Sequence, residues 1–346
     1  HAARLIVARE TDMKVAIVGA GAIGGLIAGR IAALGAPAQV SVLARGATLA
    51  QIKGAGLTIY EPDPAEAGSH RQTFAAPLPA SDNAADLGVQ DLLIISLKYN
   101  GLPSLAPELL PLIGPDTVIV SAMNGVPWWF PVGLSEAPAG LRVSTVDPDG
   151  EISAALPTAQ VLGCVVHLAG STRGPGVIQR NTGNRLILGE PSHEITPRLN
   201  QVCDLLTVAG FEIERSENIH ADLWYKLWGN MTMNPVSALT GAMSDVIMAD
   251  PQLRSFLVAV MLEAAAVGEK IGLPIAENPE DRINVTASLG PFKTSMLQDA
   301  EAGKPLELDA LVTVVREIAQ QVGVATPATD ALLGLTRVFA SAHQLN

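Results

Sequence analysis

The chain has 346 residues, of which 48% are hydrophobic and 16% are charged, and its formal net charge is -12. This length allows two domains that each bury a core, and this composition is typical of a folded globular protein. The acidic balance argues against a general nucleic-acid-binding protein, because such proteins present basic surfaces.

The cysteines and histidines exclude further classes. Cys164 and Cys203 both lie in apolar stretches, and two cysteines make no disulfide framework, which favours a reducing, cytoplasmic compartment. The six histidines are scattered without the paired spacing of metal ligands, so the sequence predicts no metal site. We expect no apolar run to span a bilayer, and therefore no membrane partner. Residues 1–12, ahead of Met13, are interpreted as an N-terminal extension whose native origin the sequence leaves open.

A glycine-rich turn follows the first predicted strand. Residues 14–18 predict a short apolar strand, Gly19-Ala-Gly-Ala-Ile-Gly24 follows at once, and residues 25–34 have the pattern of a helix. In this context the first glycine permits a tight turn, the second lets a pyrophosphate approach the backbone, and the third lets the helix pack on the strand. The helix N-terminus then attracts phosphates. A merely structural tight turn is the alternative.

The second predicted strand, residues 39–44, ends immediately before Arg45. A site for NAD would place an acidic residue near this point to bind the ribose 2′-hydroxyl. Here Ala44 is neutral and Arg45 is cationic, which suits the 2′-phosphate of NADP(H). The alternative is that Arg45 is an ordinary surface arginine.

Two more buried strands are predicted at residues 91–98 and 117–123, and they end at Lys98 and at Asn124-Gly125. Ligands of parallel sheets bind beyond the carboxyl ends of the strands, so we expect both ends to contact the cofactor. The alternatives are a solvated strand end for Lys98 and a simple turn for the Asn-Gly pair.

The pattern changes from strands to helices near Ser216. Further strands are predicted at residues 161–169, 184–188 and 211–215, with a helix at 194–210. Long helical periodicities follow at residues 218–243, 252–271, 285–302, 306–322 and 328–343. The sequence therefore predicts an α/β fold, in which an N-terminal Rossmann-type doubly wound sheet (13–216) precedes an all-α C-terminal domain (217–346).

A polar stripe crosses the first of these long helices. Lys226, Asn230 and Asn234 are each four residues apart, so they lie on nearly one line that drifts by about 40° per step. If the stripe is buried, its polar groups need partners from protein, water or a ligand. A solvated face is the equally open alternative. Pro235 is expected to kink the helix near Asn234.

A second group of polar residues lies further along the chain. Ser295 is predicted to belong to a helix that stops at Gly303, and Pro305 is predicted to start the next. Glu307 then falls in or near a first turn, where the helix dipole favours a carboxylate. Glu307 is thus either a site residue or an ordinary capping carboxylate, and nothing local decides between the two.

Together these motifs resemble the ketopantoate reductases, NADPH-dependent enzymes that reduce 2-dehydropantoate to pantoate in pantothenate biosynthesis. The likeness covers essentially everything after residue 12. It is carried by segments in a specific order, namely Gly19-Ala-Gly-Ala-Ile-Gly24, Asn124-Gly125, Lys226/Asn230/Asn234-Pro235, Ser295-Met-Leu-Gln-Asp299 and Glu307-Leu-Asp309. The resemblance implies a C-terminal domain of the 6-phosphogluconate dehydrogenase type.

The resemblance also implies roles for individual residues. Lys226 would be the general acid, and Glu307 would contact the substrate hydroxyl or the nicotinamide side. The implied substrate-binding residues are Asn124, Asn230, Asn234, Ser244 and Ser295. The implied cofactor-binding residues are Gly19, Ala20, Gly21, Ala22, Ile23, Gly24, Arg45, Lys98, Asn124 and Glu307.

Two departures from the family pattern leave the substrate open. The family often has asparagine where this chain has Ser244, and Trp128-Trp129 with the following loop is unlike the shortest members. These two tryptophans could contact the cofactor, but such residues more often belong to a core or an interface. The alternatives are therefore a reductase of another branched 2-keto acid or a non-catalytic NADP-sensing protein. No added basic cluster supports a sugar-phosphate dehydrogenase, and apolar C-terminal helices are compatible with a homodimer.

Overall fold

The computed structural model describes residues 13–36 and 38–346, so the interpretation of residues 1–12 lies outside it. The described chain divides into two compact units. The first contains the residues up to Leu97, Ser104–Met123 and Ala154–Ile219, and the second contains Lys98–Pro103, Asn124–Ser153 and His220–Asn346. Two segments of the predicted N-terminal domain, those that follow the strands ending near Lys98 and Asn124, are thus packed with the helical unit.

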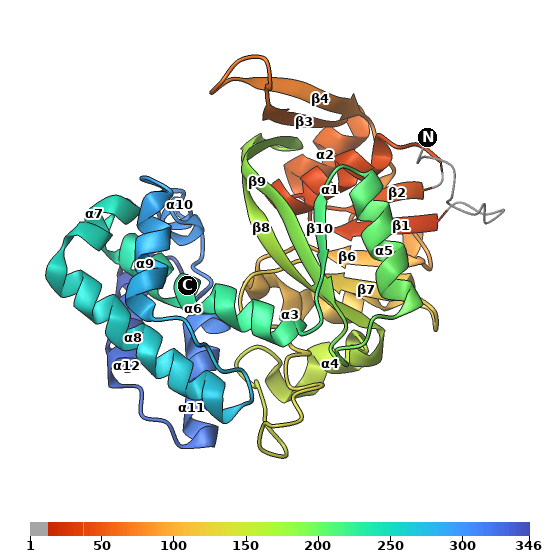
Figure 1. Ribbon diagram of the computed structural model, residues 1–346. Helices are drawn as coiled ribbons and strands as arrows, with labels where there is room; N and C mark the ends of the chain where they lie inside the picture. Colours follow the sequence, from red (N-terminus) through yellow and green to blue (C-terminus); the bar gives the residue numbers. More distant parts are fainter. Residues whose placement is uncertain (1–12, 37) are drawn as a thin grey trace. The chain divides into compact units, whose positions relative to one another are not determined.

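One mixed sheet lies at the centre of the first unit (Figure 1). In the described residues its strands are β1 Met13–Val18, β2 Ala38–Leu43, β3 Leu57–Pro62, β4 His70–Ala76, β5 Ala80–Ser81, β6 Leu92–Ile95, β7 Val118–Ser121, β8 Val161–Gly174, β9 Val177–Gly189 and β10 Glu212–Arg215. Their order is β4-β3-β9-β8-β7-β6-β1-β2-β5, with β10 paired to β9. The pairs β3–β4 and β8–β9 are antiparallel, and the other pairs are parallel.

The parallel strands bring the ends of four predicted strands to one edge. Val18 of β1 lies opposite Leu43 of β2 and Ile95 of β6, and Ile95 lies opposite Ser121 of β7. These strands are apolar runs because both faces of a parallel sheet are covered. The predicted fold class, a parallel-rich sheet followed by helices, is confirmed.

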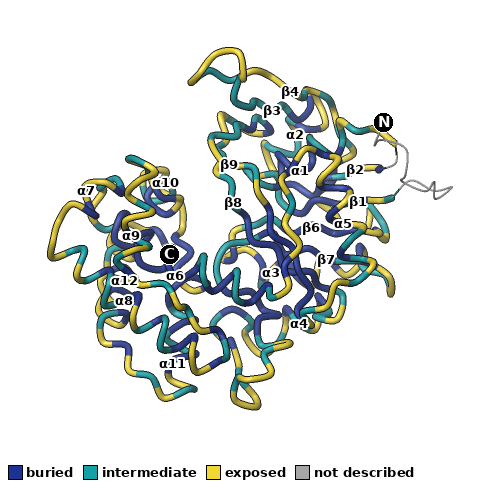
Figure 2. The backbone as a smooth tube through the Cα atoms, in the orientation of Figure 1, coloured by how far each residue is buried: buried dark blue, intermediate teal, exposed yellow. Residues whose placement is uncertain are grey.

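The helices of the first unit pack on this sheet. They are α1 Ala22–Ala32, α2 Gly46–Gly54 and α5 Pro197–Val208, while the short helices α3 Leu102–Leu105 and α4 Glu151–Ala155 lie where the chain passes between the units. Segments of 3₁₀-helix lie at Ala84–Asp86, Ala106–Leu112 and Thr158–Gln160 in this unit, and at Tyr99–Gly101 and Pro148–Gly150 in the second. The core is a continuous apolar cluster around α1 and the strands, which is dark blue in Figure 2. Cys164 and Cys203 lie within it and form no disulfide with a described residue, and burial raises the pKa of Cys203 to about 11.

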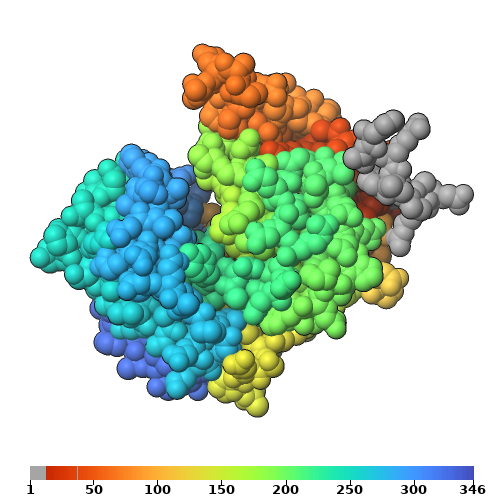
Figure 3. Space-filling view, in the orientation of Figure 1, coloured from red at the N-terminus to blue at the C-terminus, as the bar shows by residue number. Residues whose placement is uncertain are grey.

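The β3–β4 hairpin was not predicted from the sequence. Its outer strand β4 is mostly exposed, so it lacks the apolar alternation that marks a strand, and it is visible on the surface of the first unit (Figure 3, orange). The strands β8 and β9 are also longer than the predicted strands at residues 161–169 and 184–188, because their distal halves are half-buried or exposed and mixed in polarity.

The second unit is helical in its described residues. Its helices are α6 Ile219–Thr240, α7 Ser244–Ala249, α8 Pro251–Lys270, α9 Pro279–Ser288, α10 Ser295–Glu301, α11 Val314–Val322, which a π-helical turn Asp309–Thr313 precedes, and α12 Pro327–Ala342. The helix α6 continues through Pro235 to Thr240. Side-chain oxygens of Asp250, Asn278 and Thr294 cap α8, α9 and α10.

One helix prediction was wrong, and a second differs from the structure at its start. The periodicity at residues 285–302 was predicted as one helix, but Gly290 has a φ of +77° and Pro291 follows it, so α9 ends at Ser288 and α10 begins at Ser295. The helix predicted from Pro305 begins with the π-helical turn at Asp309, so Glu307 lies two residues before it, near its first turn.

The tryptophans at 128 and 129 belong to the core of the second unit. Both are buried, and the Trp129 ring meets the ring of His220 edge-on with centroids 5.3 Å apart. Phe130 stacks on Trp224 of α6 at 5.8 Å. Of the two interpretations of Trp128-Trp129, the structure supports core packing.

The helix α8 contradicts the expectation that no apolar run could span a bilayer. By length and composition alone this helix is apolar enough to do so. A single apolar helix of this length is weak evidence for a membrane span, because core helices of other proteins can be equally long and apolar. The helix α8 packs against α7, α9, α11 and α12.

Candidate active site

The glycine turn is dictated by backbone sterics in the first unit. Gly19 has a φ of +94°, and a Cβ there would lie 2.5 Å from the carbonyl oxygen of Ser96. A Cβ on Gly24 would lie 2.0 Å from the carbonyl oxygen of Gly19. A Cβ on Gly21 would meet no other atom within 4 Å, so the backbone is open where α1 begins. The first and third glycines thus permit close packing, and the second leaves room for a ligand.

The open backbone fits the phosphates of a dinucleotide. Gly21 occupies the N-cap position of α1, and no side chain caps the helix there. The unpaired N–H groups of a first helical turn and the helix dipole attract an anion. Ala20, Ala22 and Ile23 are half-buried in the same turn and bring no charge to it.

Arg45 follows β2 and occupies the N-cap position of α2. Its side chain is 62% exposed and forms an ion pair with Glu108 of the 3₁₀ turn Ala106–Leu112. The arginine lies one residue after Ala44, which follows the last residue of β2. A solvent-exposed pair of this kind is weak and exchangeable. The guanidinium therefore remains available to a stronger anion such as a phosphate.

Lys226 and Asn124 are hydrogen-bonded in the second unit. The Nζ atom of Lys226 donates to Oδ1 of Asn124 at 2.8 Å. Gly125 permits the turn after Asn124, because it has a φ of +84° and a Cβ there would lie 2.4 Å from the carbonyl oxygen of Ala310. Val126 N–H also donates to that carbonyl at 2.8 Å. The Asn-Gly pair is thus a turn that also fixes the acceptor of the lysine.

Glu307 is a buried carboxyl group beside these residues. Its Oε1 accepts the backbone N–H of Tyr99 at 2.9 Å, so the carboxyl group satisfies a donor far away in the sequence instead of capping its own helix. Burial raises the pKa of Glu307, whereas the Tyr99 N–H and the charges of Lys98 and Lys226 act in the opposite direction. Glu307 therefore keeps a proton to higher pH than an exposed glutamate.

Lys98 forms an ion pair with Asp299 of α10. The lysine side chain is 42% exposed and the aspartate only 14%, so the aspartate is the anchored partner. The lysine also favours the ionised form of Glu307, and Asp299 disfavours it. The charges of Lys98, Lys226 and Asp299 thus all act on the pKa of Glu307 within the second unit.

The amides of the α6 stripe form no side-chain hydrogen bond to the part of the chain that the structure describes. Asn230 is half-buried and Asn234 is buried, yet neither carboxamide hydrogen-bonds to another described residue. A buried amide needs partners, so these groups suit a polar ligand or water. One turn further on, Ser237 hydrogen-bonds to Thr294, the N-cap of α10. This bond holds the exposed Ser295 next to the stripe, as Ser295 follows Thr294 directly.

Ser244 has a partner within the protein. It is fully buried, and its hydroxyl accepts the backbone N–H of Phe292 at 3.0 Å. The Ser244 N–H in turn donates to the Phe292 carbonyl at 3.1 Å, so the residue joins α7 to the loop before α10. Its contact with substrate stays a prediction.

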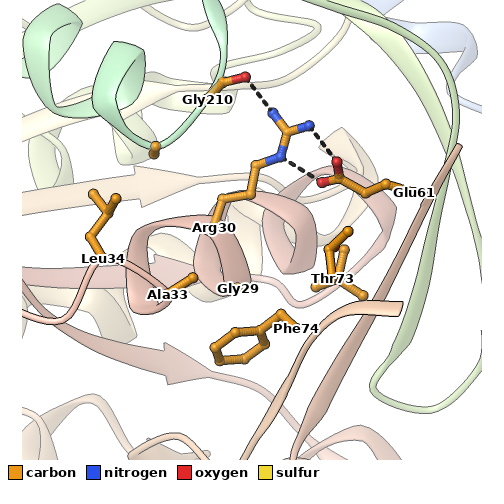
Figure 4. Close-up of a pocket in the computed structure, with 10 residues that line it drawn as sticks. Gly29, Arg30, Ala33, Leu34, Glu61, Thr73, Phe74 and Gly210 are labelled. Carbon is orange, nitrogen blue, oxygen red and sulfur yellow. Dashed lines mark hydrogen bonds and ion pairs between the residues drawn. The ribbon is translucent and has the colours of Figure 1, made fainter. Parts of the chain in front are cut away.

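A pocket of the first unit is lined by residues that hydrogen-bond to one another (Figure 4). Arg30, in the last turn of α1, donates to both carboxylate oxygens of Glu61 at 2.7 and 3.1 Å. It also donates to Asn184 at 2.7 Å and to the Gly210 carbonyl at 3.0 Å. The guanidinium is thus occupied by the protein, and we assign this pocket no ligand.

Several contacts of the candidate site could not be found from sequence patterns. The Tyr99 backbone N–H, Asp299 as the partner of Lys98, and the Ser237–Thr294 bond all join residues from distant segments. The only local signal was the spacing of Ser237, which lies three residues after Asn234 on the same helix.

A glycine turn at the edge of a parallel sheet, with a lysine, a buried glutamate and unpaired amides in a helical unit, defines a dinucleotide-dependent oxidoreductase. Family models for ketopantoate reductase PanE/ApbA match residues 15–193, and for its C-terminal part residues 218–340. The 2-dehydropantoate 2-reductase of Mesorhizobium japonicum is 39% identical over 328 residues, or 95% of this chain and 98% of that protein. The chain belongs to the ketopantoate reductase family, as the sequence motifs predicted.

Solved structures agree with this assignment. A protein of Ralstonia solanacearum MolK2 that is assigned to the ketopantoate reductases is 50% identical, with a TM-score of 0.88 over 97% of this chain and 100% of that chain. A D-mandelate dehydrogenase bound to NADH and anilino(oxo)acetate has a TM-score of 0.78 at 20% identity, over 96% and 100% of the two chains, which shows a shared fold. Family membership and the glycine turn together indicate a nicotinamide cofactor.

Proposed function

We propose that this protein reduces 2-dehydropantoate to pantoate with NADPH, and that Lys226 is the general acid. The observation that carries the proposal is the position of the Lys226 ammonium, which is held by Asn124 and lies on one stripe with two unpaired amides. A cation next to free amide donors suits a substrate that combines a ketone with a carboxylate and a hydroxyl group.

The reduction requires that negative charge on the ketone oxygen is stabilised and that a proton is delivered to that oxygen. The reduced cofactor supplies the hydride that forms the new C–H bond at the ketone carbon. As that bond forms, negative charge develops on the ketone oxygen, and the Lys226 ammonium stabilises it and transfers a proton to it. The Asn124 amide accepts one N–H of the ammonium and so orients the other two. The deprotonated lysine then regains a proton from solvent.

Other side chains position the substrate. Asn230 and Asn234 offer amide donors and acceptors, and Ser295 offers a hydroxyl group, for the substrate carboxylate and hydroxyl. Glu307 accepts or donates a hydrogen bond at the substrate hydroxyl, depending on its protonation state. Holding the reactants in this way supplies part of the rate enhancement through effective molarity.

The preference for NADPH rests on Arg45. Neither Ala44 nor Arg45 can accept a hydrogen bond from the ribose 2′-hydroxyl as an acidic residue would. Among the described residues, the exposed guanidinium of Arg45 is paired with Glu108 through an exchangeable surface ion pair. A doubly charged 2′-phosphate is a stronger partner for this group than a single carboxylate.

A keto-acid panel tests the proposal. The purified protein is mixed with NADPH or NADH and with 2-dehydropantoate or other branched 2-keto acids, and oxidation is followed at the nicotinamide absorbance band. We expect the highest kcat/KM for 2-dehydropantoate with NADPH, and pantoate as the product. A higher kcat/KM for another keto acid would make that compound the substrate instead of 2-dehydropantoate. NADPH binding without oxidation of any keto acid would favour an NADP sensor.

The cellular setting follows from the same proposal. Pantoate formation places the protein in pantothenate biosynthesis in the cytoplasm, where NADPH is supplied. A homodimer is consistent with exposed apolar side chains on α12, where Leu335 is 62% and Val338 71% exposed. Light scattering of the purified protein at several concentrations would determine the oligomeric state.

A further inference from the structure

Tyr99 is a buried residue that joins two distant parts of the second unit. Its backbone N–H donates to Oε1 of Glu307 at 2.9 Å, and its phenol hydroxyl donates to the backbone carbonyl of Val146. Burial and the charge of Asp147 raise the pKa of Tyr99, so the phenol keeps its proton and remains a donor. One residue thus connects the candidate glutamate to the loop that follows the two core tryptophans.

The backbone around Tyr99 lies along the segment that carries Glu307. The side-chain amide of Asn100, the next residue, donates to the Leu306 carbonyl at 3.3 Å. Two consecutive residues of one segment therefore bind two consecutive residues of the other. Glu307 lies outside the helices of the second unit, between α10 and the π-helical turn. The position of its carboxyl group therefore depends on these contacts between segments.

The phenol of Tyr99 contacts a loop that is attached to α11. The carboxylate of Glu317 in α11 accepts the backbone N–H groups of Ser144 and Thr145 at 2.7 and 2.8 Å. Val146 follows these two residues directly, and its carbonyl accepts the phenol hydroxyl. The helix α11 in turn continues the π-helical turn. The phenol is thus connected through the loop to the helix that follows the candidate glutamate.

We propose that Tyr99 is a positioning residue, which holds the Glu307 carboxyl group at the substrate hydroxyl and so favours 2-keto acids that carry this hydroxyl. The inference rests on the proposed function, in which Glu307 binds that group. The contacts from Glu307 through Tyr99, the loop and α11 close on themselves, so the carboxyl group is fixed from two sides. Loss of the phenol hydroxyl opens this ring of contacts and leaves the aromatic ring and the backbone N–H in the chain. Because a hydrogen bond weakens steeply with distance and angle, a small shift of Glu307 is enough to weaken its bond to the substrate.

Two substrates test the position of the carboxyl group. We measure kcat/KM for 2-dehydropantoate and for its deoxy analogue, in which hydrogen replaces the hydroxyl group. The proteins are wild type, Tyr99→Phe and the control Tyr60→Phe, which removes a phenol from β3 of the first unit. We expect Tyr99→Phe to lower the ratio of the two values by about 3- to 10-fold, which is the effect of one weakened hydrogen bond. Tyr60→Phe should keep the wild-type ratio.

The Glu307→Gln background shows whether Tyr99 acts through the glutamate. There Tyr99→Phe should change the ratio by less than about twofold, because the effects of two residues that act through one contact do not add. An equal fall of the ratio in both backgrounds, or no fall in the wild-type background, would overturn the inference and leave the phenol a purely structural role. Glu317→Gln replaces one of the two acceptor oxygens of the loop and should lower the ratio in the same way. It decides the question if Tyr99→Phe does not fold.

A readout without turnover separates this inference from the proposed function. Burial raises the pKa of Glu307, and the Tyr99 N–H lowers it. The charges of Lys98 and Lys226 also lower it, whereas that of Asp299 raises it. A weaker N–H bond in Tyr99→Phe should therefore raise the pH at which Glu307 stops stabilising the fold. This pH is obtained from melting temperatures, by comparing wild type and Tyr99→Phe each with its own Glu307→Gln form.

The two readouts fail in different ways. If wild type reduces no keto acid, the proposed function fails, and the melting temperatures decide whether Tyr99 holds Glu307. A higher pH in Tyr99→Phe than in wild type would then support the contact, and an unchanged pH would overturn the inference. If wild type reduces 2-dehydropantoate, the ratio of the two substrates decides.

Discussion

Lys226 and Asn124 are 102 residues apart in the sequence, yet the ammonium donates to the amide oxygen at 2.8 Å. A neutral acceptor orients the lysine without forming an ion pair. The amide oxygen carries no formal charge, so this contact does not cancel the charge of the ammonium. This relationship is the basis of the first two predictions.

The Lys226→Ala variant should lose turnover and keep its cofactor affinity. Removing a positioned general acid lowers the rate by about 10²- to 10⁴-fold. We expect kcat with 2-dehydropantoate to fall in this range, while the dissociation constant of NADPH, measured by fluorescence, changes little. Lys293→Ala is the control, because Lys293 is exposed and pairs with Glu301. A variant with near wild-type kcat would remove Lys226 from the mechanism.

The Asn124→Asp variant tests the neutral acceptor. It has nearly the same shape but turns the contact into an ion pair, in which the lysine holds its proton more strongly and its charge is partly cancelled. We expect kcat to fall by about tenfold or more, which corresponds to about 1.4 kcal/mol in the barrier. The pH–rate profile should extend its alkaline limb to higher pH. An increase in kcat would show that the neutral amide is not needed.

Glu307 should make stability depend on pH in an unusual direction. Burial raises its pKa, so the folded protein keeps the proton at pH values where the unfolded chain, with a pKa of about 4.3, has lost it. The stability that Glu307 contributes by keeping this proton is fully present below about pH 4.3. It is lost as the pH rises through the pKa that Glu307 has in the folded protein. Glu307→Gln keeps an acceptor for the Tyr99 N–H and cannot ionise.

The melting temperatures of wild type and Glu307→Gln, measured from about pH 4 to about pH 8, check this prediction. The variant should gain stability relative to wild type as the pH rises. Its kcat/KM for 2-dehydropantoate should also fall, because the variant cannot change its hydrogen-bonding state at the substrate. A stability difference that is constant with pH would contradict the raised pKa.

Gly24→Ala should damage the cofactor site. The new Cβ would lie 2.0 Å from the Gly19 carbonyl oxygen, so the glycine turn must shift away from α1. We expect weaker binding of both NADPH and NADH and a lower melting temperature. Gly54→Ala is the matched control in α2, since its Cβ would meet no other atom within 4 Å. Equal cofactor affinities in the two variants would show that the turn tolerates the shift.

Arg45 and Glu108 should affect the two cofactors differently. Arg45→Ala should raise the KM for NADPH by about tenfold or more and leave the KM for NADH nearly unchanged, because only NADPH has a 2′-phosphate. Glu108→Gln removes the competing carboxylate of the exposed pair. Such pairs contribute at most about 1 kcal/mol, so the KM for NADPH should fall by at most about fivefold. Parallel changes with both cofactors would exclude this role for Arg45.

The sequence alone determined the features that depend on short-range geometry. The glycine turn was predictable because three glycines at fixed spacing between an apolar strand and a helix allow one local backbone path. The stripe of Lys226, Asn230 and Asn234 was predictable because helical periodicity places residues four apart on one side. The parallel-rich sheet and the long helices followed from the same two kinds of pattern, except where exposed strands such as β4 have no apolar alternation.

Only the tertiary structure decided which distant residues meet. Nothing local distinguished a capping role of Glu307 from its contact with the Tyr99 N–H. The sequence favoured a core or an interface for Trp128 and Trp129, and only the structure decided for the core. Arg282 is an ordinary helical arginine in the sequence, and only folding places its guanidinium over the ring of Tyr225, whose hydroxyl donates to the carboxylate of Glu277. Burial and charge pairing are set by side chains from many segments at once, so they follow from packing and not from sequence periodicity.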